Sequence, residues 1–153
     1  MIDKIKQLFK SRVKKFKFDP QRFDCIINDA TFVNGTISFD GTLRIDGHVF
    51  GDLTARVEDE SAVVVTGQLE MKKDLTAKVL VICPGGRVIC KHKITADVVV
   101  MHSGSHVECI TLEYKSLSIK DGAQLIGTLR LNTQKQPNPY PSDTVKALPN
   151  ETT

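Results

Sequence analysis

The middle of the chain repeats a short pattern of hydrophobic and polar positions. Each copy opens with two apolar residues one position apart, at Leu43/Ile45, Val63/Val65, Val79/Val81, Val98/Val100 and Leu117/Ile119. A second pair, an apolar residue and then a small residue or Met, follows at Val49/Gly51, Leu69/Met71, Val88/Cys90, Val107/Cys109 and Leu125/Gly127. Successive second pairs lie 20, 19, 19 and 18 residues apart, and turn-forming residues separate the two pairs of each copy. Very short alternating segments at this period are typical of a β-solenoid.

Alternation within each pair sends its two members to one side of a strand and the intervening residue to the other. One coil of this length buries nothing alone, but coils stacked about 4.8 Å apart form continuous columns of Val, Ile and Leu. We therefore predict an all-β, single-stranded β-helix over residues 31–131. Cys90 and Cys109 would be neighbours in one inward column, as packed thiols, a disulfide or a metal-binding pair.

The residues between the members of each pair are expected to face solvent. Val64, Leu80 and Val99 occupy equivalent outward positions on three successive coils, which predicts a lateral apolar stripe. Contiguous exposed apolar stripes tend to be interfaces. This stripe would serve either lateral bundling of the solenoids or the seating of the segment 23–27.

Both ends of the predicted solenoid carry apolar residues, namely Phe32, Ile37 and Phe39 at the start and Leu125, Leu129 and Leu131 at the end. A β-helix ends in unpaired backbone groups and an open core, and solenoids that stay single usually carry a polar cap. No amphipathic cap directly follows either end. We therefore expect end-to-end polymerisation through these residues. The alternative is that residues 23–27 or an N-terminal helix cover the ends.

Residues 1–18 form a basic amphipathic segment. Seven Lys or Arg side chains against Asp3 give this segment a side-chain charge of +6, although the whole chain carries only +3. On a helical wheel, one side is apolar and consists of Ile2, Ile5, Leu8, Phe9, Val13 and Phe16. The basic residues include Lys4, Lys6, Lys10 and Lys14. Such a helix suits an anionic membrane surface, while a solvated tail or a helix packed on the solenoid are the alternatives.

The remaining composition narrows the function classes. With 41% hydrophobic and 25% charged residues, the chain fits one modest soluble domain, flanked by a linker at 19–30 and a Pro-rich tail at 132–153 that we expect to be disordered. No run approaches the roughly 18 apolar residues of a membrane span, and a secretory signal is missing, so we expect a cytoplasmic protein. The folded part is not basic and has few aromatic residues, which disfavours nucleic acid. We find no catalytic site, metal site, cofactor site or nucleotide-binding P-loop.

The run GTISFDGTLRIDGHVFGDL at 35–53 resembles the opening of the bactofilin domain. Residues 84–94 and 117–131 match later coils of that domain more loosely. The resemblance implies a right-handed triangular β-helix that polymerises without nucleotide. It also implies filaments on the inner face of the cytoplasmic membrane that localise cell-envelope partner proteins, such as cell-wall or cell-shape enzymes.

A left-handed β-helix of the hexapeptide-repeat acyltransferase type is the rival interpretation. Val63, Leu69, Leu75 and Val81 recur at six-residue steps, as that fold requires. The next two positions of this series are Arg87 and Lys93, and coils of unequal length fit the right-handed form better.

Overall fold

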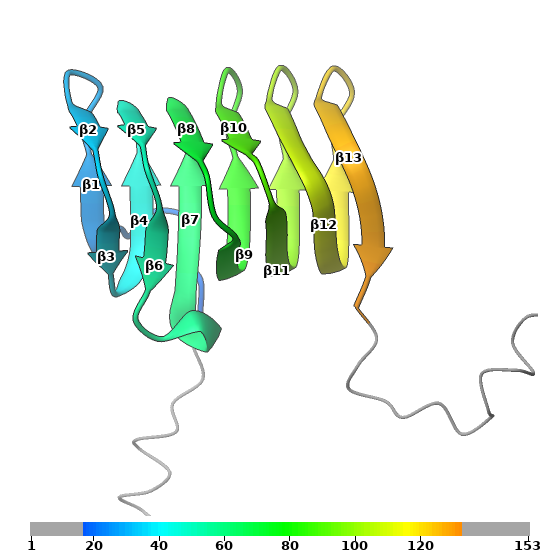
Figure 1. Cartoon of the computed structure of the whole chain (residues 1–153), viewed down its shortest axis with the longest axis horizontal. Helices are drawn as coiled ribbons and strands as arrows, with labels where there is room; N and C mark the ends of the chain where they lie inside the picture. The colour runs from blue at the N-terminus through cyan, green and yellow to red at the C-terminus, as the bar shows by residue number, and fades with distance from the viewer. Residues whose placement is uncertain (1–16, 133–153) are drawn as a thin grey trace, which may run out of the picture.

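The computed structural model describes residues 17–132, and this part of the chain winds into a stack of parallel strands with about six turns (Figure 1). The strands are β1 (Cys25–Ile27), β2 (Phe32–Asn34), β3 (Ile37–Phe39), β4 (Gly41–Ile45), β5 (His48–Phe50), β6 (Leu53–Ala55), β7 (Ser61–Val65), β8 (Gln68–Met71), β9 (Leu75–Ile82), β10 (Arg87–Cys90), β11 (Lys93–Met101), β12 (His106–Ile119) and β13 (Gln124–Leu131). A short 3₁₀ turn, η1 (Glu58–Glu60), lies between β6 and β7. The all-β solenoid is confirmed.

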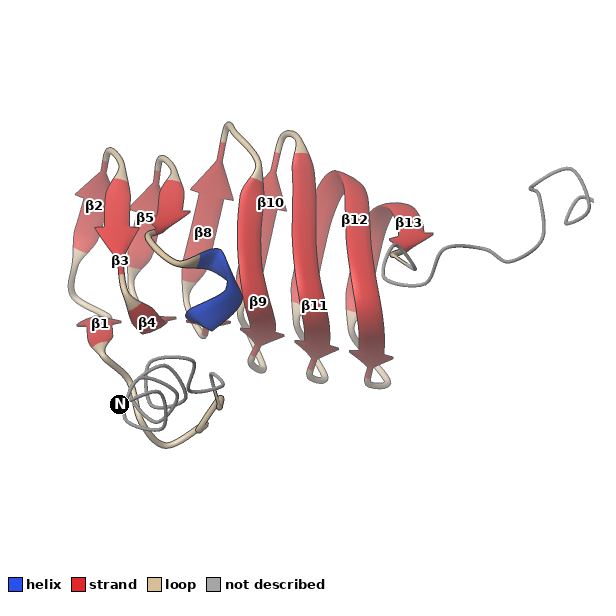
Figure 2. Ribbon diagram, turned by 90° about the horizontal axis from the view of Figure 1, so that it is seen from below, coloured by secondary structure: helices blue, strands red, loops and turns tan. Residues whose placement is uncertain are grey.

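Each coil contributes one segment to each of three faces. The first face contains β1, β4, β7 and the later parts of β9, β11 and β12. The second face contains β2, β5, β8, β10 and the first parts of β12 and β13. β3 and β6 pair on the third face, which continues through the early parts of β9 and β11 (Figure 2).

The solenoid begins earlier than the sequence pattern indicates. β1 pairs with β4 in the register Cys25↔Leu43 and Ile27↔Ile45, so this strand lies inside the segment expected to be a linker. The basic segment and the Pro-rich tail lie almost entirely outside the described residues. Within residues 17–132, no helix has the length and apolar character needed to span a bilayer.

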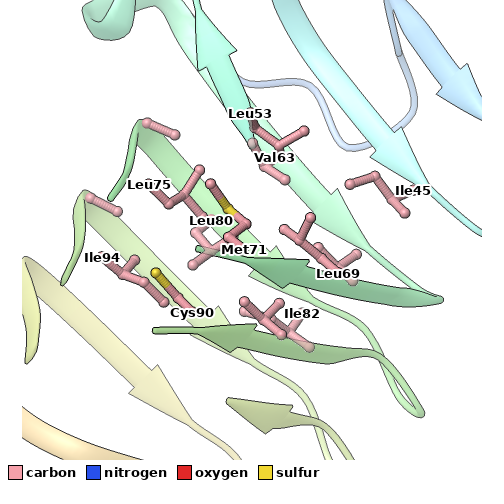
Figure 3. Close-up of a cluster of buried hydrophobic side chains, with 14 of the residues drawn as sticks. Ile45, Leu53, Val63, Leu69, Met71, Leu75, Leu80, Ile82, Cys90 and Ile94 are labelled. Carbon is pink, nitrogen blue, oxygen red and sulfur yellow. The ribbon is translucent and has the colours of Figure 1, made fainter. Parts of the chain in front are cut away.

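Columns of aliphatic side chains fill the interior of the stack. Figure 3 shows Val63, Leu69, Leu80, Ile82 and Ile94 converging on this core from the strands around it. All five are fully buried. Each column continues through successive coils, since the strands pair in parallel with aligned residues.

The inward residues of β9 and β11 differ from the sequence prediction, which is wrong for the pairs Val79/Val81 and Val98/Val100. Leu80 aligns with Val63 and Val99 aligns with Leu80, and both are core residues with 0% and 1% exposure. The predicted lateral stripe is therefore wrong for Leu80 and Val99. Lys78 and Asp97 are corner residues that follow the inward-facing Ala77 and Ala96, so the next inward residue comes three positions later instead of two.

The same register excludes the six-residue repeat of the rival fold. Leu69 and Leu75 lie in the core, but Val81 is on the outer side of β9 and Arg87 is exposed. A hexapeptide solenoid needs all of these positions to point inward. The interior therefore follows coils of unequal length rather than six-residue steps.

Close contact between the second and third coils requires glycine at the turn between the first and second faces. A Cβ atom on Gly67 would lie 2.1 Å from the carbonyl oxygen of Gly47, the equivalent residue one coil earlier. Gly67 also donates its backbone N–H to the carbonyl oxygen of Ile45, at 2.9 Å. The turn between the first and second faces thus stacks backbone on backbone with no room for a side chain.

Candidate assembly interface

The C-terminal end of the solenoid exposes residues that face inward. On β13, Leu129 aligns with Leu112 and Leu131 aligns with Tyr114, so both leucines continue core columns. Leu129 is nevertheless 45% exposed and Leu131 is 55% exposed. Leu125, over Val107, is half-buried and packs against the core. These three predicted residues therefore lie together at the unfinished end of the core.

A fourth residue of this end was not among those singled out from the sequence. Ile119 aligns with Met101, a fully buried residue, yet Ile119 is 44% exposed. The pattern contained the necessary signal, because Ile119 is the last member of the repeated first pair. The C-terminal end thus presents an apolar surface formed by Leu125, Leu129 and Leu131 of β13 with Ile119 of β12, called here the C-terminal core opening.

The backbone at this end is also ready for pairing. Within the described residues, β13 pairs only with β12, and the last part of β12 pairs only with β11. The opposite edges of these terminal strands carry N–H and C=O groups that the solenoid itself does not use. An unused parallel edge beside an open apolar core is a template for another coil.

The N-terminal end differs in what it exposes. Phe39 is only 4% exposed and belongs to the core, where it aligns with the small Ala55. Phe32 is 64% exposed, but it lies on the outer side of β2, because Val33 is the residue that aligns with inward-facing Val49. The ring of Phe32 contacts the ring of Phe50, with centroids 5.0 Å apart (a stacking of outer side chains).

Of the three residues predicted for the N-terminal interface, Ile37 alone lies at the edge of the core opening. It is half-buried, packs against the core and aligns with Leu53. The prediction is wrong for Phe39, which Ala55 accommodates inside the core, and Phe32 points outward rather than along the stack. The inward-facing Cys25, which aligns with Leu43, is exposed at the same end of the stack.

Asp24 closes part of the N-terminal end. Its carboxylate Oδ2 accepts the backbone N–H of Thr42 at 2.9 Å, and its own N–H donates to the Thr42 carbonyl at 2.9 Å. Asp24 therefore satisfies both backbone groups of Thr42 at the start of β4. The outer edges of β1, β2 and β3 nevertheless stay unpaired within the described residues.

The interior offers little reactive chemistry. The four cysteines are free, and Cys90 is buried with its Sγ 3.2 Å from the Lys73 carbonyl oxygen. Burial raises the pKa of the Cys90 thiol, and burial together with the nearby Cys90 raises the pKa of Cys109 to about 11. Both side chains are therefore protonated at neutral pH and pack as thiols. Among the residues that the structure describes, no three His, Cys, Asp or Glu side chains are grouped to hold a metal ion.

Comparison with known proteins agrees with this architecture. A solved structure, the cryo-EM reconstruction of Thermus thermophilus bactofilin double helical filaments, matches with a TM-score of 0.59 and 23% identity. The match covers 71% of this chain and 99% of that chain. No curated protein matches. The family model described as "Bactofilin: Polymer-forming cytoskeletal" matches residues 25–130, most of the 153-residue chain, and confirms the resemblance of residues 35–53. The chain belongs to the bactofilin family of polymer-forming cytoskeletal proteins.

Proposed function

We propose that this bactofilin assembles end to end, with the C-terminal core opening of one subunit covered by the terminal coil of the next. The observation that carries the proposal is the exposure of inward-facing Leu129 and Leu131, which sit directly over buried residues. Covering each half-exposed leucine contributes on the order of 1 kcal/mol, and the free backbone edge adds further hydrogen bonds. Assembly of this kind extends the core of each subunit into its neighbour.

Assembly proceeds without nucleotide in this proposal. The sequence contains no Gly-Lys-Ser/Thr run of a P-loop. The contact consists of aliphatic side chains and backbone, so its strength follows the apolar area that it buries. Subunit concentration would therefore control filament growth.

The proposed cellular role is positional. Residues 1–18 would attach filaments to the anionic cytoplasmic face of the membrane, and each basic residue near such a surface contributes on the order of 1 kcal/mol. One segment binds weakly, but a filament presents many copies in a row, so avidity stabilises attachment. The filament would then hold cell-envelope or localisation partner proteins at one place.

The outer side of the second face supports a scaffold role, because it repeats from coil to coil. After Phe32 of β2, one column continues through five polar side chains: His48, Gln68, Arg87, His106 and Gln124. Within it, His106 contacts Gln124 at 3.1 Å and Glu108 at 3.0 Å. Polymerisation would extend this polar column into a regular surface for partners.

The assembly proposal is tested by two matched arginine substitutions on β13. Leu129→Arg places a charge in the C-terminal core opening, whereas Ile126→Arg changes a residue of similar exposure, 54%, on the outer side of the same strand. We expect L129R to give folded single subunits and I126R to give filaments. Electron microscopy and sedimentation velocity without nucleotide measure assembly, and circular dichroism checks the β-fold. Filaments formed by folded L129R would contradict the proposal.

A further inference from the structure

The outer side of the first face carries an apolar surface that differs from the predicted stripe. It consists of the outward residues of three adjacent strands, Ala62 and Val64 on β7, Val79 and Val81 on β9, and Val98 and Val100 on β11. The aligned positions on β12 are Ser116 and Ser118, so the apolar character ends there. We call these six residues the outer valine face.

Burial across the outer valine face is graded. Along one column, the exposed fraction rises from 0% for Ala62 to 7% for Val79 and 36% for Val98. Val98 has a strand on each side, as Val79 does, so strand neighbours alone do not shield an outward side chain. Val64, on the outer side of β7, is also only 4% exposed. The shielding is therefore concentrated over β7 and β9.

The N-terminal side of the described chain reaches this same region. Lys17, the first described residue, lines a hollow with Arg22, Thr42 and Glu60. Thr42 is itself outward-facing, 4% exposed, and aligns with Ala62 of the outer valine face. Lys17, where the described chain begins, therefore lies at the edge of the face where its residues are most buried.

Length and charge of the preceding segment match the face. A helix of 15 residues is about 22 Å long. The face and its two flanking strands span four coil spacings, or about 19 Å. The segment is strongly basic, and the acidic residues Glu58, Asp59 and Glu60 of η1 border this edge, whereas Asp40 at the neighbouring corner already pairs with Arg56. The η1 carboxylates would face the basic side of a helix whose apolar side contacts the valines.

We propose that the apolar side of residues 2–16 docks on the outer valine face and that membrane binding requires its release. The inference rests on the membrane role proposed above for the same residues. In a helix, Ile5, Phe9 and Val13 share one side, and that side cannot contact the solenoid and a bilayer at once. Docking therefore lowers the membrane affinity of single subunits, and the filament's many copies overcome this competition.

A tryptophan introduced at position 9 tests docking directly, because the chain contains no Trp. The Phe9→Trp substitution is made in the L129R chain, so that filament contacts do not affect the signal. We expect blue-shifted emission that acrylamide quenches poorly. Adding Val81→Asp, or Val98→Asp as a second variant, should shift the emission to the red and raise quenching severalfold. Ile89→Asp, on the outer side of β10 in the second face, is the matched control and should leave the emission unchanged.

Three outcomes would overturn docking. The first is that the introduced tryptophan is as accessible to acrylamide in the starting chain as in V81D, and the second is an equal response to I89D. The third is a dimer of the starting chain that V81D dissociates, because a second copy would then cover the face.

Vesicles containing phosphatidylglycerol separate docking from the membrane role. V81D should bind them severalfold more tightly than the starting chain, because it releases the segment. If the tryptophan is protected from acrylamide but no variant binds vesicles, docking still holds. That result would contradict the membrane role and the proposed competition between the solenoid and the bilayer.

Discussion

Leu129 lies directly over Leu112 in one inward column, yet Leu129 is 45% exposed and Leu112 is completely buried. The two residues have the same type, the same direction and the same strand alignment. They differ in whether another described coil lies beyond them. The last coil of the solenoid therefore has the side-chain pattern of an interior coil but lacks a coil on its outer side. A second subunit could provide that missing coil.

This pair predicts that an alanine substitution lowers mainly folding stability at Leu112 and mainly assembly at Leu129. Leu112→Ala creates a cavity in the core and should lower the free energy of unfolding by about 2–5 kcal/mol. Leu129→Ala should cost single subunits about 1 kcal/mol or less, because half of its side chain is already in water. It should raise the concentration needed for assembly. Urea unfolding of L112A and L129A, each combined with Leu131→Arg to keep the subunits single, and sedimentation of the L129A chain measure the two effects. Equal losses of unfolding free energy would contradict this account.

A second prediction concerns the turns that stack between coils. Gly67→Ala should prevent close contact of the second and third coils, since the new Cβ would collide with the Gly47 carbonyl oxygen at 2.1 Å. Gly85→Ala should cost only about 1–2 kcal/mol, the strain of a left-handed residue, because its φ is +82° and no atom lies within 4 Å. Thermal unfolding of both variants compares the two costs. A milder effect for Gly67→Ala than for Gly85→Ala would refute the stacking argument.

The fold could be predicted from the sequence because its repeat places Val, Ile and Leu at matched positions in successive coils. The inward register of the first strands was also readable: Leu43 and Ile45 alternate with the polar Arg44. In contrast, residues 79–82 and 98–101 are apolar throughout, so alternation gives no signal there. The one-residue corners at Lys78 and Asp97, which contain neither Gly nor Pro, reversed the register without any visible turn.

The exposed, inward-facing residues could be predicted from the sequence at the C-terminal end only. Leu129 and Leu131 were identified because nothing resembling a cap follows them. At the other end, an aromatic residue in the first coil looked equivalent whether it faced outward, like Phe32, or filled the core, like Phe39. The backbone cap by Asp24 was also hidden, because the sequence does not indicate that its carboxylate reaches Thr42 in the next coil.

The buried thiols predict a loss of stability at alkaline pH. Burial raises the folded-state pKa of Cys109 from 9.0 to about 11, and raises that of Cys90 in the same direction. The unfolded chain therefore releases these protons first as pH rises. Their contribution to stability is complete below pH 9 and is lost as pH rises from 9 toward 11. Cys109→Ala should flatten this part of the unfolding profile, measured in urea at several pH values. An unchanged slope would exclude Cys109 as its source.

The same burial predicts the order in which the cysteines react. Cys25 is exposed, whereas Cys90 is buried and Cys109 is half-buried with a raised pKa. The thiolate is the reactive form, so in single L129R subunits an alkylating reagent at about pH 7.5 should modify Cys25 first and Cys90 only on unfolding. Mass spectrometry of peptides after timed alkylation measures this order. Rapid modification of Cys90 in the folded protein would contradict the core packing.

The proposed membrane role makes a prediction that separates attachment from assembly. Deleting residues 2–17 should abolish binding to anionic vesicles and leave filaments intact, because the C-terminal core opening is unchanged. L129R keeps all seven basic residues of the segment, yet it should bind the same vesicles more weakly than filaments do, since single subunits lack avidity. Binding by filaments should also fall as salt rises and be weak on zwitterionic vesicles, because electrostatic attraction contributes much of the affinity. Co-sedimentation with vesicles measures all three chains. If the deletion chain sediments with anionic vesicles as well as the full chain does, attachment comes from the solenoid itself.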